Sequence, residues 1–284
     1  MGTLLNVEDL YMTYFGGYVG VDTVSFKMND GEHFVIYGKT LSGKSSLLRT
    51  IAGLEEYKGK IEFFNVSEKV FSFDEKSLKK NDTVFNSLSY PLKIRNISNF
   101  ESVVLEQAKK YKIDSILNEK IKNLNLEQKK IVLIARALIR SADIYLFDDV
   151  FKDIKERYDE IFKIFLKDIE GKSIIFATSN IAEAFSVSNV VSIMAYKKYL
   201  QRGTKEELLS LPKNREVLIS LGIEDNMPSI LTKKEDKYYL EDVEVVPPIS
   251  DIYVGKEVTS ILVDGKIRND VYFDKDTDYL ISKW

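Results

Sequence analysis

The chain has 284 residues, of which 44% are hydrophobic, enough for one large domain or for a large and a small one. Its formal net charge of −3 gives no electrostatic case for binding nucleic acid, which requires a clustered basic face. Because there is no cysteine, neither a disulfide nor a thiolate metal site can form. No apolar stretch approaches the ~20 residues that span a bilayer, and no signal peptide opens the chain, so we expect a soluble, intracellular protein.

The first part of the chain shows the alternation of apolar and polar residues that indicates strands. Residues 4–14 and 21–28 follow this pattern, and Phe15-Gly16-Gly17 predicts a turn between them. Asn29-Asp30-Gly31 predicts a second tight turn. It leads into residues 33–37, a short apolar run that is typical of a buried strand.

The segment that follows, Gly-Lys-Thr-Leu-Ser-Gly-Lys-Ser, fits the phosphate-binding loop pattern of Gly, four residues and Gly-Lys-Ser. It lies between the strand and a predicted helix over residues 46–53, which is the context the pattern needs; the alternative is a chance glycine-rich turn. Backbone N–H groups and the helix N-terminus would bind phosphate, while Lys44 would bridge the outer phosphates and the Ser45 hydroxyl would ligate magnesium. The predicted nucleotide-binding residues here are Gly38, Lys39, Thr40, Leu41, Ser42, Gly43, Lys44, Ser45 and Ser46.

Alternating strands and helices occupy the middle of the chain. Short strands are expected at residues 59–64 and 70–73, and helices between residues 84 and 138. An apolar run, residues 144–147, then predicts a buried strand that ends in two carboxylates, Asp148 and Asp149. The alternation continues with a helix, a strand, a helix and a strand, at residues 158–169, 173–178, 181–186 and 190–194.

This β/α alternation predicts an α/β fold with a mainly parallel sheet and helices on both of its faces. Ligands of such sheets bind at the carboxyl ends of the strands, where Ser42, Asp148 and Ser179 would meet. Beyond about residue 225 the pattern changes to short strands broken by Pro247-Pro248, Gly255 and Asp264-Gly265, which predicts a small β-barrel. We therefore expect a nucleotide-binding domain over residues 1–225, with a helical subdomain at about 84–138, and a small β domain over 226–284.

With these motifs in order, residues 3–222 resemble the ATP-binding subunit of an ABC transporter, most of all importer subunits with an extra C-terminal OB/TOBE-like β domain, such as those for sugars. Gly31-Glu32, the run from Gly43 to Arg49 and Ile51-Ala52-Gly53-Leu54 carry the resemblance. It implies a P-loop NTPase fold that binds ATP and Mg²⁺ and dimerises head to tail with a second ATP-binding subunit. It also implies permease subunits that hold the chain peripherally at the cytoplasmic face of the cell membrane.

The resemblance assigns further roles position by position. Asp148 would hold magnesium through water, and Asp149 takes the place of the glutamate that polarises the attacking water, one methylene shorter. With Lys44, these two acids are the expected catalytic residues. Asp74 falls where the family has a glutamine and could approach the magnesium beside Ser45 and Asp148. Phe15, with Tyr14 beside it, falls on the aromatic that stacks on adenine; the alternative is a core aromatic.

Other positions depart from the family pattern. The signature Leu-Ser-Gly-Gly-Gln appears as Leu124-Asn125-Leu126-Glu127-Gln128, so that side chains, one of them negative, stand where backbone should approach the partner's phosphate. The switch histidine falls on Ser179, and the only histidine, His33, precedes the phosphate loop on another strand. The aspartate that ends the loop after Asp149 is replaced at about Lys155. Binding elements are kept, whereas elements for hydrolysis and capping are changed.

The resemblance therefore implies a transporter subunit with weak or asymmetric ATP hydrolysis, in a heterodimer more readily than in a homodimer. A permease helix would enter a groove near residues 74–86, with Tyr90 and Pro91 at its helical side. One alternative is a non-hydrolysing regulatory or structural subunit in which ATP holds the dimer together. Another is a soluble family member acting on ribosomes or in DNA repair. The β domain could bind a ligand or a regulatory protein, or it could widen the dimer contact.

Overall fold

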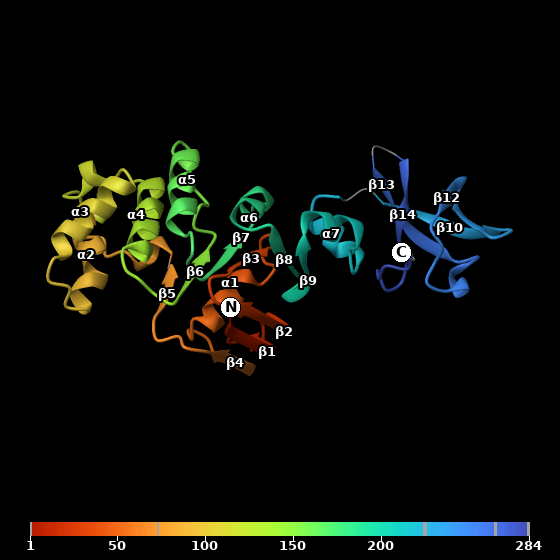
Figure 1. Cartoon of the computed structure of the whole chain (residues 1–284), viewed down its shortest axis with the longest axis horizontal. Coiled ribbons are helices and arrows are strands. Elements are labelled where there is room, and N and C mark those ends of the chain that lie inside the picture. The colour runs from red at the N-terminus through yellow and green to blue at the C-terminus, as the bar shows by residue number, and fades with distance from the viewer. Residues whose placement is uncertain (1, 73, 224–225, 264–265, 283–284) are drawn as a thin grey trace.

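The computed structural model describes residues 2–72, 74–223, 226–263 and 266–282 of the chain. In Figure 1 the helices α2 to α4 lie at one end of the molecule, the central sheet with α1 lies in the middle, and the strands β10 to β14 lie at the other end. None of the helices in the described part is both long and apolar enough to cross a membrane.

The central element is a six-stranded sheet with the strand order β5-β6-β7-β3-β8-β9. Its strands are parallel except that β8 and β9 pair antiparallel. Two connections within it, β5 to β6 and β6 to β7, cross over to a parallel neighbour, and each passes through helices. The strands are β3 (His33–Tyr37), β5 (Lys69–Ser72), β6 (Ile144–Asp148), β7 (Ile174–Thr178), β8 (Val190–Ala195) and β9 (Lys198–Thr204).

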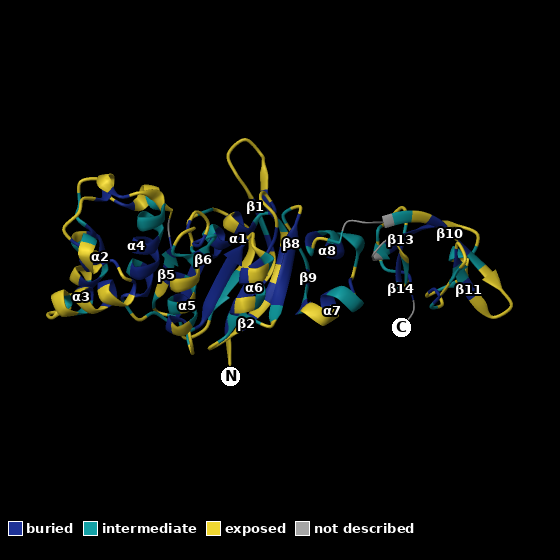
Figure 2. Cartoon of the chain, turned by 90° about the horizontal axis from the view of Figure 1, so that it is seen from above, coloured by how far each residue is buried: buried dark blue, intermediate teal, exposed yellow. Residues whose placement is uncertain are grey.

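Side chains along the buried strands point alternately to the two faces of this sheet, and each face has its own core. Phe34 and Ile36 of β3 pack against α1 (Lys44–Ile51), while Val35 and Tyr37 face the opposite side. That opposite face is covered by α4 (Leu126–Leu138), α5 (Tyr158–Asp168) and α6 (Ile181–Val187). Figure 2 shows the central strands of this sheet mostly buried, whereas the outer surfaces of the helices are exposed.

A second, antiparallel sheet completes the face that α1 covers. Its order is β2-β1-β4, with β1 (Thr3–Thr13), β2 (Val19–Asn29) and β4 (Lys58–Phe63). Apolar residues of β1 and β2 share a core with Leu47, Leu48 and Ile51 of α1. The helix that follows the phosphate loop is thus held between two sheets, which fixes the direction of its N-terminus.

The helical segment comprises α2 (Val84–Ile94), α3 (Phe100–Lys110) and α4. It is tied to the core helix α5 through Asp168, whose carboxylate accepts hydrogen bonds from Lys110 and, at 2.9 Å, from the buried Tyr111 hydroxyl. Burial raises the pKa of Tyr111, so its hydroxyl stays a donor. Two short helices, α7 (Lys205–Ser210) and α8 (Arg215–Ser220), lead to the C-terminal strands.

The C-terminal part is a five-stranded antiparallel sheet with the order β12-β11-β10-β13-β14. The sheet curls until β14 reaches the chain just after β12: the Tyr272 hydroxyl donates to the Val246 carbonyl at 2.7 Å, and the Val246 N–H donates to the Asn269 carbonyl at 3.0 Å. The strands are β10 (Asn226–Lys234), β11 (Lys237–Leu240), β12 (Val243–Val245), β13 (Glu257–Val263) and β14 (Lys266–Asp274). A nearly closed β structure is therefore confirmed.

The α/β fold with a mainly parallel sheet is confirmed as well, and most predicted elements agree with the structure to within two or three residues. The strands β9 and β10 and the helices α7 and α8 were not predicted. β9 is rich in polar residues because it lies at the edge of the sheet. Phe73, the turn at Asp264-Gly265 and residues 224–225 at the expected domain boundary lie outside the described residues. The division into domains stays a prediction.

Candidate nucleotide-binding site

The phosphate-loop segment joins the carboxyl end of β3 to the N-terminus of α1. Gly38 is confined by the neighbouring strand, since a Cβ there would lie 2.2 Å from the Met194 carbonyl oxygen. Gly43, the residue that caps α1, has a φ of 104° and would place a Cβ 2.8 Å from the Gly20 oxygen. Both positions thus require glycine. No side chain caps α1, so its first N–H groups face outward and can donate to an anion.

The Lys44 side chain folds back over this loop. Its ammonium donates to the Gly38 carbonyl at 2.7 Å and the Lys39 carbonyl at 3.4 Å, and lies 3.8 Å from Asp149 Oδ2. Only 4% of the side chain is exposed, and this burial lowers the pKa of Lys44, partly offset by Asp149 and then Asp148. The ammonium is therefore held at the centre of the loop by carbonyl oxygens and a carboxylate.

The two acids at the end of β6 have different partners. Asp148 Oδ1 accepts a 3.0 Å hydrogen bond from the Ser45 hydroxyl. Burial raises the pKa of Asp148, and the charge of Asp149 raises it further. Asp149 has a φ of 43°, and its Oδ1 accepts from both the N–H and the hydroxyl of Ser179, at 2.7 and 2.9 Å. The fold has thus brought Ser45 to Asp148 and Ser179 to Asp149, at the strand ends where Ser42, Asp148 and Ser179 were expected to meet.

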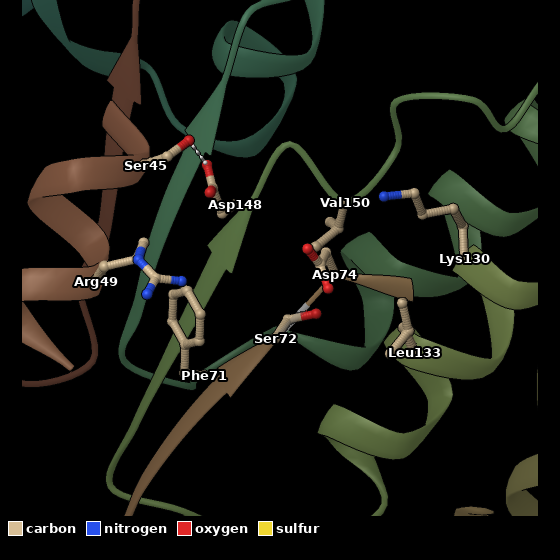
Figure 3. Close-up of a pocket in the computed structure, with 9 residues that line it drawn as sticks. All are labelled: Ser45, Arg49, Phe71, Ser72, Asp74, Lys130, Leu133, Asp148 and Val150. Carbon is tan, nitrogen blue, oxygen red and sulfur yellow. Dashed lines mark hydrogen bonds between the residues drawn. The ribbon is translucent and has the colours of Figure 1, made fainter. Parts of the chain in front are cut away.

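A pocket of about 260 Å³ lies between α1, β5 and α4, and all three residues predicted to bind metal line it (Figure 3). Ser45 and Asp148 face each other, whereas Asp74 lies apart from them. Asp74 also caps the short 3-10 helix Glu75–Ser77 by accepting from the Lys76 N–H at 3.1 Å. In the described part of the chain no three acidic or histidine side chains form a metal cluster. Ser45 and Asp148 suit a magnesium ion that takes most of its ligands from phosphate and water.

A second cavity, of about 420 Å³, lies over the phosphate loop itself. Tyr14 is one of its lining residues, and the Tyr14 hydroxyl lies 2.9 Å from Ser46 Oγ. Phe15 is fully exposed and does not line this cavity, so the alternative of a core aromatic is wrong for Phe15. The aromatic ring beside the loop is therefore that of Tyr14, while adenine stacking on Phe15 stays a prediction.

His33 lies at the opposite end of β3 from the phosphate loop. Its two ring nitrogens lie 3.2 Å from the Val187 carbonyl and 3.0 Å from the Ile169 carbonyl. This agrees with the expectation that it cannot take the part of a histidine at position 179.

The N-terminus of α4 contrasts with that of α1. Asn125 and Gln128 form a capping box, in which each side chain accepts from the other residue's N–H, at 2.8 and 3.0 Å. The Glu127 carboxylate accepts from the N–H groups of Lys155 and Arg157 in the same chain, at 3.3 and 2.9 Å. Its charge is therefore directed to the chain's own loop after β6, which differs from the direction expected from the sequence.

The comparisons with known proteins agree with this geometry. The family model described as "ABC transporter" matches residues 21–152. Residues 21–152 therefore belong to an ATP-binding domain of the ABC transporter family. It is 31% identical over 218 residues to the molybdate/tungstate import ATP-binding protein WtpC of Pyrococcus horikoshii, covering 71% of this chain and 63% of that protein. To the sn-glycerol-3-phosphate import ATP-binding protein UgpC of Rhizobium meliloti it is 28% identical over 233 residues, covering 77% of this chain and 67% of that protein.

A solved ATP-binding cassette, in a dimeric post-hydrolysis state with ADP and Pi, has the same fold, with a TM-score of 0.65 and 20% identity. The match covers 71% of this chain and 98% of that one.

Two lysines of this ABC domain were missed in the sequence. Lys152 and Lys197 both line the cavity over the phosphate loop. The Lys197 N–H donates to the Ser42 carbonyl at 2.8 Å, although 155 positions separate them, and no local pattern reveals such a contact. Lys152 lies three residues beyond Asp149 in the sequence. A positive charge so close to the predicted catalytic acid was the signal that could have placed Lys152 at the site.

Proposed function

We propose that the chain is the ATP-binding subunit of an ABC importer and that it binds Mg-ATP at the phosphate loop. The observation that supports this most directly is the joint placement of Lys44, Ser45 and Asp148 beside the uncapped N-terminus of α1. The names of the curated relatives support the importer assignment. The subunit would be cytoplasmic and would lie on the membrane through its permease partners.

Each part of the site has a defined task in this proposal. N–H groups from Leu41 to Ser46 and the positive end of α1 bind phosphate oxygens. Lys44 exchanges its bonds to loop carbonyls for bonds to the outer phosphates. The Ser45 hydroxyl and Asp148 hold magnesium, which neutralises charge on the phosphates when bound, and Asp74 remains a proposed outer ligand. Tyr14 or Phe15 lies against the base.

We propose that hydrolysis at this site is slow. Asp149 Oδ1 is already hydrogen-bonded twice by Ser179, and Asp149 Oδ2 faces the Lys44 ammonium. A carboxylate engaged in this way is a weak base for water, and a serine hydroxyl is neither basic nor long enough to replace an imidazole. A second ATP-binding subunit with a regular signature would cap this chain's ATP in a heterodimer.

The permease is proposed to dock in the groove between the sheet and the helical segment. A cavity of about 320 Å³ lies there, and Tyr90, Pro91 and Ser77 are among its lining residues. The half-exposed Tyr90 ring lies at its rim, 5.4 Å from the Lys79 ammonium. The partly buried Arg136 also lines it and donates to Ser77 Oγ at 3.0 Å. An apolar helix with a few polar side chains suits this lining.

Cross-linking tests the docking site, since the chain has no native thiol. Cysteines at the exposed positions Lys79 and Asn86 should capture the permease in membranes that contain both proteins. A cysteine at Asp236, in the turn after β10, is the control. Capture from Asp236 alone would refute the placement.

The solute is proposed to be small, and the permease and its binding protein would choose it. A sugar stays the prediction from the resemblance, but the names of the relatives compared above favour an anion: molybdate or tungstate and sn-glycerol-3-phosphate. A second candidate function is a non-hydrolysing regulatory subunit, which the double hydrogen bond from Ser179 to Asp149 favours.

Calorimetry with Mg-ATP tests binding, and single-turnover hydrolysis by the chain alone and with its partner subunit separates the two functions. Slow but measurable turnover that the partner accelerates supports the importer subunit with weak or asymmetric hydrolysis. Tight binding without turnover in either case favours the regulatory subunit. Absence of ATP binding would contradict both.

A further inference from the structure

The loop that follows β6 separates two cavities. One is the cavity of about 420 Å³ over the phosphate loop, and the other, of about 550 Å³, lies beside Ser179 and Glu183. Two residues line both cavities, Asp149 and Lys152. Lys152 therefore lies at the side of the phosphate loop where the predicted catalytic acid lies.

The backbone of this loop is held firmly, so the position of Lys152 is well defined. The Lys152 N–H donates to the Asp149 carbonyl at 3.1 Å, which closes a turn. Its neighbour Phe151 is buried, with its ring 4.9 Å from that of Phe162 and 5.0 Å from that of Phe165. Because Phe151 anchors the turn in the core, the adjacent Lys152 is directed outward and is exposed.

The charges around the cavity over the phosphate loop are unbalanced. Its charged lining residues are three lysines, Lys44, Lys152 and Lys197, and a single acid, Asp149. In the described part of the chain no hydrogen bond or ion pair involves the Lys152 side chain, whereas Lys44 is bonded to carbonyls and lies near Asp149. After burial, which is the largest cause, the charge of Lys152 also lowers the pKa of Lys44. Two ammonium groups that repel each other across a cavity favour a polyanion between them.

We propose that Lys152 binds the terminal phosphate of ATP within the same chain and thereby makes this site selective for ATP over ADP. The inference rests on the proposed function and concerns the same cavity. Lys44 is expected at the outer phosphates, and Lys152 flanks it on the side of Asp149, where the terminal phosphate faces the attacking water. A cation from the chain itself thus supplies charge that a partner's helix N-terminus would otherwise provide alone. Lys152 is a phosphate-binding residue in this proposal.

The test compares the affinities of the full chain for Mg-ATP and Mg-ADP by calorimetry, at an ionic strength of about 0.15 M. Lys152→Gln should weaken ATP binding about tenfold, the low end for loss of a hydrogen bond to a charged group, and ADP binding less than twofold. Lys152→Arg should retain most of the selectivity. Lys155→Gln is the matched control, because Lys155 is an exposed lysine of the same loop that lines only the cavity beside Ser179. Thermal unfolding of each variant reports on folding.

Each outcome decides the proposal. Equal losses for ATP and ADP, or no loss for ATP, would overturn it, because Lys152 would then not distinguish the terminal phosphate. A tenfold loss with Lys155→Gln would overturn it too, because the effect would then be one of general charge. If the wild-type chain binds neither nucleotide, the proposed function itself fails. That result differs from failure of the present proposal, in which the wild-type chain binds ATP and Lys152→Gln does not change the preference for ATP over ADP.

Discussion

Two helix N-termini of the same domain, those of α1 and α4, illustrate how a sequence makes or removes an anion site. Both carry the partial positive charge of their helix. α1 begins after Gly43 with no side-chain cap, so its N–H groups face the cavity over the phosphate loop. α4 begins with the capping box of Asn125 and Gln128, and Leu126 and Glu127 add side chains at its first turn.

The difference lies in which groups use the N–H donors. At α4 the N–H of Gln128 is already bonded to Asn125, and the Glu127 carboxylate is bonded to the loop at Lys155 and Arg157. An incoming phosphate would have to displace these bonds and pass the exposed Leu126 side chain. At α1 nothing local competes, so the donors remain for a ligand. The N–H groups of a helix N-terminus can bind an anion only where no side chain of the same chain already caps them.

The strongest test of this contrast removes the cation from the α1 side. Lys44→Ala should lower ATP affinity by about 10²-fold or more, because a charge-assisted contact to the outer phosphates is lost. Calorimetry measures the effect, and Lys163→Ala, an exposed lysine on α5, is the control. Unchanged ATP affinity in Lys44→Ala would remove the basis of the proposed function.

A second test restores the hydrolytic groups beside α1. Asp149→Glu with Ser179→His should raise turnover about tenfold or more when the partner subunit is present, since a longer carboxylate and an imidazole reach the attacking water. It should raise turnover much less in the chain alone, where α4 still carries its own cap. Phosphate release is the measurement. Wild-type turnover at or above about 1 s⁻¹ in the chain alone would show that Asp149 suffices.

The α4 side can be opened by three substitutions. Asn125→Ser, Leu126→Gly and Glu127→Gly together restore the family's signature pattern, because Leu124 and Gln128 are already present. We expect ATP-dependent self-association several-fold stronger than in the wild type, at a cost in stability of about 1 kcal/mol for each glycine in the helix. Light scattering with and without ATP measures it. Asn125→Ser alone is the control, since serine can still cap the helix. Equal association of all three proteins would show that α4 does not limit dimerisation.

The smallest expected effect concerns Asp148, whose pKa is raised by burial and then by Asp149. A raised carboxyl pKa in the folded state means that stability falls as the pH rises through the window from the unfolded pKa to the folded pKa. Asp148→Asn should therefore unfold a few degrees higher at neutral pH, by about 1 kcal/mol, and lose this advantage in acid, while magnesium-dependent binding weakens. Thermal unfolding from about pH 3, below the usual aspartate pKa of ~3.9, to about pH 8 measures it. A lower unfolding temperature at neutral pH would contradict the burial argument.

The sequence by itself determined the α/β class, the phosphate loop and the acids that end β6. Each of these features has a signal within a short stretch of sequence. The phosphate loop has its spaced glycines, the acids follow an apolar run, and the alternation of strands and helices appears as a change in the spacing of apolar residues. The alternation also predicted that Ser42, Asp148 and Ser179 meet at the strand ends. In the structure Ser45 bonds to Asp148 and Ser179 bonds to Asp149, while Ser42 lines the cavity over the phosphate loop with Asp149. The polar edge strand β9 was not predicted, because an edge strand is only partly buried and its apolar pattern is weaker.

Only the tertiary structure decided which side chains surround the cavity over the phosphate loop. Tyr14, and not Phe15, lines it, because the turn after β1 sends the two neighbours in different directions. Lys197 reaches it through a turn between β8 and β9, and Glu127 turns to the chain's own loop because N–H groups there lie within hydrogen-bond reach. The direction of a side chain and the contacts between distant segments follow from packing in three dimensions. They cannot be predicted from the spacing of residues along the chain.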